Sequence, residues 1–181
     1  MAVAYVYCDF NIRNMQSTSA VLGLVLKQVV EALKEIPNEV QKAFGRAKKQ
    51  TEGCGLRLPE ILDILTKSLL SLKRGFICID ALDEFPTKQL AQLWKSLQRV
   101  IRECPNTRLF LTGRPQIRTE VEDYFPGEAD MVTIEPPEED IRRYIEARLK
   151  KDLGKSTMDE ELRADIRRVI PKRVEGMYVL T

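Results

Sequence analysis

Residues 75–84 read Gly75-Phe-Ile-Cys-Ile-Asp80-Ala-Leu-Asp83-Glu84, an apolar run that leads directly into an acidic cluster. A short apolar run behind a glycine is typical of a fully buried strand, and we predict that strand over residues 76–80. From these residues alone, two interpretations of the carboxylates stay open. They form either a site that needs negative charge or an ordinary acidic turn before the next helix.

A second segment favours the site. Residues 108–112 are predicted to form a strand that ends at Thr112 and is followed by Gly113-Arg114-Pro115. Ligands of parallel α/β sheets bind at the carboxyl ends of the strands, so the two strand ends are expected to converge. Phosphoryl-transfer sites need a metal held by carboxylate, a group that orients water and a cation near the phosphates.

Each of these roles has a candidate in the two segments. Asp80, at the strand end, suits Mg²⁺ coordination through water, because Mg²⁺ keeps much of its hydration shell. Asp83 and Glu84 are candidates for polarising a water molecule. Arg114 is the candidate for contacting phosphate oxygens. Arg13 follows another predicted strand, where it is either a polar site residue or a loop arginine, and we favour the loop arginine.

The rest of the chain alternates between strand and helix patterns. Further strands are predicted over 3–8 and 131–134, and helices over 19–35, 59–72, 87–103, 116–124, 138–152 and 159–170. Near-continuous apolar strands separated by helices predict an α/β fold with a parallel sheet covered on both faces.

Composition narrows the classes of function. The 181 residues carry a net charge of +2, which gives no strong attraction to nucleic acid or membranes, and no apolar run is long enough to span a bilayer. Basic residues between 142 and 173 alternate with acidic ones, which favours solvated helix faces over a nucleic-acid interface. We therefore expect neither nucleic-acid nor membrane partners.

Histidine is absent, which excludes His-dependent triads and most zinc sites and leaves acid–base chemistry to Asp and Glu. The cysteines form no CxxC pair and no secretory signal precedes them. We interpret them as reduced thiols of a cytoplasmic protein. They are Cys8, Cys54, Cys78 and Cys104.

These segments resemble a family. Residues 76–84 look like the Walker B motif of NACHT domains, which belong to the STAND class of P-loop NTPases. Residues 108–115 look like their sensor 1 strand, with Gly113 in place of a usual serine. The segments at 5–10, 134–144 and 174–178 agree, and the likeness is greatest to fungal NLR-like, or nephrocystin-3-like, N-terminal domains. An AAA+ relative is a third option, but Gly-Arg-Pro after the strand favours the STAND branch.

The resemblance implies a three-layer P-loop NTPase-like fold and an ATP-dependent switch that oligomerises with NACHT-type relatives. By resemblance, Asp80 holds Mg²⁺, Asp83 and Glu84 support hydrolysis, and Arg114 beside Thr112 senses the γ-phosphate of ATP. A partial nucleotide-binding core is expected over 1–135, and the start of a helical region over 136–181.

A Walker A loop is missing from these residues. Gly154-Lys155-Ser156 lacks the earlier glycine, since Leu149 stands there, and it follows a charged helix instead of an apolar strand. The family's expected strand order, 5-1-4-3-2, would here lack strand 1. We therefore expect a fragment that is inactive alone and binds Mg²⁺ and ATP only if a Walker A is supplied from upstream. The alternative is a non-enzymatic NACHT remnant that acts as a protein-interaction module.

Overall fold

The computed structural model describes residues 1–33, 35–36, 38, 40–42, 45, 56–134, 136–152 and 159–173. Their contacts divide the chain into two units, Met1–Ala129 and Asp130–Thr181. Several sequence predictions lie outside the described residues: the Gly-Lys-Ser at 154–156, the family-like segment at 174–178, and the interpretation of Cys54.

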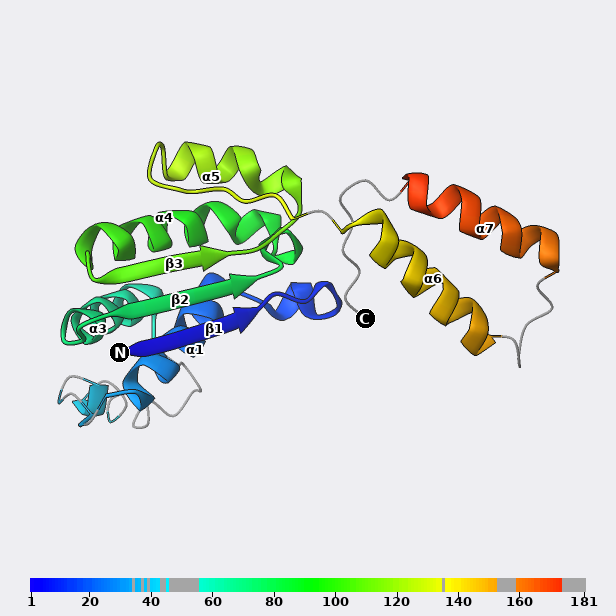
Figure 1. Ribbon diagram of the computed structural model, residues 1–181. Coiled ribbons are helices and arrows are strands. Elements are labelled where there is room, and N and C mark those ends of the chain that lie inside the picture. Colours follow the sequence, from blue (N-terminus) through cyan, green and yellow to red (C-terminus); the bar gives the residue numbers. More distant parts are fainter. Residues whose placement is uncertain are drawn as a thin grey trace. The chain divides into compact units, whose positions relative to one another are not determined.

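The first unit is built on a parallel sheet in which β2 (Gly75–Asp80) lies between β1 (Ala2–Tyr7) and β3 (Thr107–Leu111) (Figure 1). These three strands confirm the predictions over 3–8, 76–80 and 108–112. Tyr5, Cys78 and Phe110 are register partners across the sheet, so all three side chains lie on one face. The acidic cluster therefore follows the central strand, with a neighbour on each side.

Helices cover the other face of the sheet. They are α1 (Thr18–Glu31), α3 (Leu58–Leu70) and α4 (Thr87–Glu103), and Figure 1 shows all three behind the strands. The Ser17 hydroxyl accepts from the Ala20 N–H at 3.1 Å and so starts α1, as a cap should. The core lies between the two layers, where Leu22, Leu65 and Leu97 have no exposed surface.

The expected cover on both faces is wrong for the described residues of this unit, which form two layers. The chain passes from β1 to β2 to β3 in one direction, and right-handed crossovers then place every connecting helix on the same side. The opposite face, which we call the open face, keeps large side chains exposed. These are Val3 (51%), Tyr5 (57%), Tyr7 (67%) and Phe110 (64%).

The strand predicted over 131–134 is also wrong, since these described residues form no strand. Val132 is 82% exposed and Ile134 is 69% exposed. An extended segment becomes a strand only when a neighbouring strand takes up its backbone groups. Among the described residues, no strand pairs with this segment.

Each edge of the sheet is engaged at one residue by a group outside the sheet. On β1, the side chain of Gln28 accepts from the Tyr5 N–H at 3.1 Å and donates to the Tyr5 carbonyl at 2.9 Å. On β3, the Thr107 N–H donates to Cys104 and its carbonyl accepts from Arg108. Alternate residues of β3 point away from β2, so Leu109 and Leu111 direct backbone groups outward. No described residue outside the sheet is bonded to these groups.

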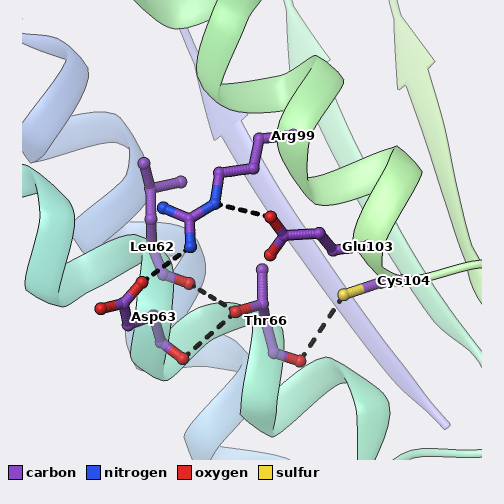
Figure 2. Close-up of polar contacts among 6 residues, drawn as sticks. All are labelled: Leu62, Asp63, Thr66, Arg99, Glu103 and Cys104. Atoms are coloured by element: carbon purple, nitrogen blue, oxygen red, sulfur yellow. Dashed lines mark hydrogen bonds and ion pairs between the residues drawn. The ribbon is translucent and has the colours of Figure 1, made fainter.

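Polar contacts join α3 to α4 (Figure 2). Arg99 donates to Glu103 at 2.9 Å and to Asp63 at 2.8 Å, and these bonds raise the pKa of its guanidinium. The Thr66 hydroxyl donates to Leu62 and Asp63 carbonyls of its own helix, and the Thr66 carbonyl accepts from the Cys104 thiol at 3.5 Å. The bonds of Arg99 to Asp63 and of Cys104 to Thr66 hold α3 against α4 and the residue that follows it. Since α4 connects β2 to β3, these bonds help to fix the helix layer.

After β3 the chain forms η3 (Pro115–Ile117) and α5 (Arg118–Tyr124), close to the helix predicted over 116–124. The end of α5 packs on α4. The Trp94 ring is stacked on Tyr124 at 5.9 Å between centroids and meets the edge of Phe125 at 6.1 Å. The carboxyl end of β3 is thereby connected to the core.

The second unit contains α6 (Glu138–Asp152) and α7 (Glu160–Arg173), which pack together. Ile145 and Leu149 are buried, and Arg167 of α7 pairs with Glu146 of α6 at 2.7 Å. Arg142 and Arg143 pair with glutamates one turn earlier. Within the part of the chain that the structure describes, no helix is both long and apolar enough to cross a membrane.

Candidate functional site at the carboxyl end of the sheet

The ends of β2 and β3 converge, as the sequence predicts. The Thr112 hydroxyl donates to Asp80 Oδ1 and accepts from the Ala81 N–H at 3.0 Å. The Thr112 carbonyl accepts from the Leu82 N–H at 2.9 Å. Thr112 therefore holds both the Asp80 carboxylate and the backbone that leads into the acidic turn, residues 81–85.

Asp83 and Arg114 contact each other. Asp83 Oδ1 accepts from the Arg114 N–H at 3.1 Å, and Arg114 Nε lies 3.4 Å from Asp83 Oδ2. The Asp83 side chain is 6% exposed and that of Arg114 is 63% exposed, so the carboxylate is enclosed while the guanidinium faces solvent. The enclosed Asp83 carboxylate thus holds Arg114 so that its guanidinium faces solvent at the surface of the site.

Gly113 is explained by this contact. A Cβ built at Gly113 would lie 2.6 Å from Ile117 Cδ1 and 3.3 Å from Asp83 Oδ1. The serine usual in the resembling family would therefore displace the Ile117 side chain and press on the carboxylate. Glycine lets the backbone pass close enough for Arg114 to reach Asp83.

Glu84 is held from the opposite side, by η1 (Phe10–Met15), which follows β1. Glu84 Oε2 accepts from the Phe10 N–H at 2.9 Å. Arg13 of η1 donates to the Phe85 carbonyl at 3.0 Å and to the Thr87 hydroxyl at 2.8 Å. Arg13, which the sequence alone led us to interpret as a loop residue, contacts the acidic turn directly.

Cys8 directly follows β1 and lies close enough to the three carboxylates for their charges to act on its thiol. Burial, the largest cause, and the charges of Glu84, Asp80 and Asp83 together raise the pKa of its thiol to about 11. The thiol is therefore neutral at physiological pH. It packs as a small apolar group beneath the site and is no nucleophile there.

The acidic turn begins with backbone strain. Ala81 adopts φ 53° and ψ 46°, and it is the only residue other than glycine with positive φ among those described. This left-handed conformation costs an alanine roughly 1–2 kcal/mol. It turns the chain sharply, so that Leu82–Glu84 form the short helix η2 directly above the ends of β2 and β3.

Replacing Ala81 with glycine is expected to stabilise the chain by about 0.5–1 kcal/mol, because glycine adopts this conformation freely and the unfolded-state entropy offsets only part of the gain. Urea unfolding monitored by circular dichroism measures the change. Ala20→Gly, in the first turn of α1 with ordinary helical geometry, is the control and should destabilise. A loss of stability in Ala81→Gly would mean that the strain is not real.

The site was tested for its fit to Mg²⁺ and to nucleotide phosphates. No group of three or more Asp, Glu or Cys side chains that could enclose a metal occurs among the described residues. Asp83 and Glu84 are already engaged by Arg114 and Phe10, which leaves Asp80 beside Thr112. One carboxylate suits Mg²⁺ only where phosphates and water complete its shell. The residues present fit the metal-holding half of such a site and not the phosphate cradle.

The structure thus brings together all five residues that the sequence singles out. They fall into three contacts: Asp80 with Thr112, Asp83 with Arg114, and Glu84 with the backbone of η1. The contribution of η1 was missed, because Phe10 acts through its backbone and Arg13 lies far away in sequence. A signal was present in the position of Arg13 just after a strand whose end meets the same edge of the sheet.

Comparison with known proteins adds a family. The model of a family described as nephrocystin 3, N-terminal, matches residues 1–114, a range that contains the sheet, the acidic turn and Arg114. Neither the curated proteins nor the solved structures contain a match to the chain. Since the matched range covers more than half of the chain, the protein belongs to the nephrocystin 3 N-terminal family.

Proposed function

We propose that the carboxyl end of the sheet is the Mg²⁺-holding and phosphate-sensing part of a nucleotide site in a NACHT-type STAND module. The observation that carries the proposal is the contact between Asp80 and Thr112 at the ends of two adjacent parallel strands. In α/β proteins ligands bind at this edge of the sheet. Asp80 would hold the metal through water, and Mg²⁺, when bound, offsets the negative charge of phosphates.

Arg114 is the proposed phosphate sensor. Its guanidinium is mostly exposed, while its backbone N–H and one side-chain nitrogen are held by Asp83. A phosphate oxygen competes with Asp83 for the same guanidinium, so nucleotide binding and the Asp83 contact are linked. This linkage suits a switch. The contacts of Asp83 and Glu84 support positioning roles, and their role in hydrolysis stays a prediction.

A phosphate-binding loop is needed to complete the site, and we propose that it comes from sequence outside these 181 residues. The outward backbone groups of Leu109 and Leu111 offer a place beside β3 where its strand would pair. Without that loop, only weak nucleotide binding and no efficient hydrolysis are expected. The cofactors of the complete module would be Mg²⁺ and ATP.

The first test is nucleotide binding to the 181-residue chain, followed by amide NMR. We expect Mg²⁺–ATP to shift the amides of Ala81, Thr112 and Arg114 with a dissociation constant on the order of 1 mM, about −4 kcal/mol. Asp80→Asn should remove the Mg²⁺ dependence of these shifts. Glu31→Gln, an exposed carboxylate on α1 that is 62% exposed, is the control and should change nothing.

The second candidate function is a protein-interaction module that self-associates with NACHT-type relatives, and the open face favours it. Exposed Tyr5, Tyr7 and Phe110 on one sheet face are more typical of a covered surface than of a free one. The same titration separates the two candidates. Absence of any shift at about 10 mM nucleotide, roughly ten times the expected dissociation constant, would reject the nucleotide site and leave the interaction module.

A further inference from the structure

The acidic turn is held on two sides. After β3, Thr112 binds the Ala81 N–H and the Asp80 carboxylate just before the turn, and Arg114 binds Asp83. From β1, the η1 helix binds it through the Phe10 N–H and Arg13. The two sets of contacts meet on neighbouring residues, since Asp83 belongs to the first and Glu84 to the second.

Arg13 makes the side-chain part of the η1 contact. Its Nη2 reaches both the Phe85 carbonyl and the Thr87 hydroxyl, so one guanidinium spans the end of the turn and the start of α4. The guanidinium also lies over the Phe10 ring, 5.9 Å from its centroid, and this fixes Arg13 relative to the residue that binds Glu84. Both bonds come from this one nitrogen, which has one N–H group for each acceptor.

We infer that Arg13 is a positioning residue of the site: it fixes residues 83–85, so that Asp83 is presented to Arg114 and Glu84 to η1. The inference deepens the proposed function, and its consequence for metal binding rests on that function. Its structural consequence does not, because the geometry of the turn can be measured without metal or nucleotide.

The direction in which metal affinity changes distinguishes a positioning role from that of a simple counter-charge. A cation near Asp80, Asp83 and Glu84 that served only as a counter-charge would repel a divalent metal, so its removal would strengthen metal binding. A positioning residue has the opposite effect. When the turn is no longer fixed, the carboxylates lose their orientation and the metal binds less tightly.

The decisive experiment is amide water exchange by NMR on the full 181-residue chain carrying Arg13→Gln. Exchange of the Phe10 and Arg114 amides should each rise at least about tenfold, because local opening becomes easier. Phe10 adjoins Arg13, whereas Arg114 touches it nowhere and depends on Asp83. An unchanged exchange rate of the Arg114 amide would overturn the inference and show that Arg13 affects only its immediate neighbours.

The control is Arg108→Gln. The Arg108 guanidinium also donates to two backbone carbonyls, those of Pro105 and Thr107, each at 3.0 Å, but it lies at the opposite end of β3. Its loss should leave the Phe10 and Arg114 amides unchanged. If Arg13→Gln unfolds the chain, Arg13→Lys keeps the charge, and an increase in Arg114 exchange in that variant decides the question in the same way.

A second experiment measures the affinity of the chain for Mn²⁺ from the broadening of the NMR signal of Thr112. Arg13→Gln should weaken Mn²⁺ binding by roughly fivefold, about 1 kcal/mol. Stronger binding in the variant would show a counter-charge and overturn the inference. If the wild-type chain binds no Mn²⁺ at all, the proposed metal site fails, while the exchange experiment still decides the role of Arg13.

Discussion

Replacing Trp94 with alanine is expected to lower the free energy of unfolding by about 3–5 kcal/mol, the usual cost of emptying a large buried aromatic site. Trp94 is 1% exposed and sits between α4 and the end of α5, in contact with the rings of Tyr124 and Phe125. A cavity there also frees α5, which follows the arginine of the candidate site. Urea denaturation with fluorescence and circular dichroism measures the loss.

Two further variants separate the causes. Trp94→Phe keeps most of the ring packing and removes an indole N–H that has no acceptor among the described residues, so it should cost far less than the alanine variant. Tyr7→Ala, on the open face at 67% exposure, should change the free energy of unfolding by no more than about 0.5 kcal/mol. Equal losses in Trp94→Ala and Tyr7→Ala would mean that the open face is covered and the core assignment is wrong.

The second large effect is expected for Asn106→Ala, which should lower the free energy of unfolding by about 2–3 kcal/mol. Its amide donates to the Leu69 carbonyl at 2.8 Å and to the Leu72 carbonyl at 2.5 Å, which satisfies the end of α3. Its backbone carbonyl accepts from the Gly75 N–H at 3.0 Å, a bond that the alanine variant keeps. One residue thereby connects α3 to the start of β2 and β3, and thermal or urea unfolding reports its loss.

The informative comparison is with Asn106→Asp. Aspartate has nearly the same volume but presents only acceptors at neutral pH, so it faces the two carbonyls with negative charge. It should therefore destabilise at least as much as alanine does. If aspartate is tolerated while alanine is not, the effect of Asn106 comes from its volume and the hydrogen bonds contribute little.

Much of the fold could be predicted because the relevant signals are local. The apolar run before Asp80 and the run before Thr112 each specify a strand, and α4 was predicted with the bounds it has. The segment at 131–134 has an equally good strand pattern and forms none. Pairing depends on a neighbour, and no property of those residues alone shows whether one is present.

The candidate site also has one part that the sequence predicts and one part that it does not. Convergence of Asp80 and Thr112 follows from parallel strands in adjacent positions, so their order in sequence was sufficient. The engagement of Glu84 by η1 was not predictable, because the donor is a backbone N–H that every residue carries. The single covered face follows from the direction of the crossovers, since β1, β2 and β3 lie in the order of the sequence.

The Gln28 amide presents to Tyr5 one acceptor and one donor, the same pair that a peptide unit of an adjacent strand would present. A side chain thus imitates a neighbouring strand at one residue of the β1 edge. Its effect is local, because Val3 and Tyr7 direct their backbone groups outward from β1 with no bonded partner among the described residues, as Leu109 and Leu111 do from β3. Both edges of the sheet therefore keep backbone groups with which a further strand could pair.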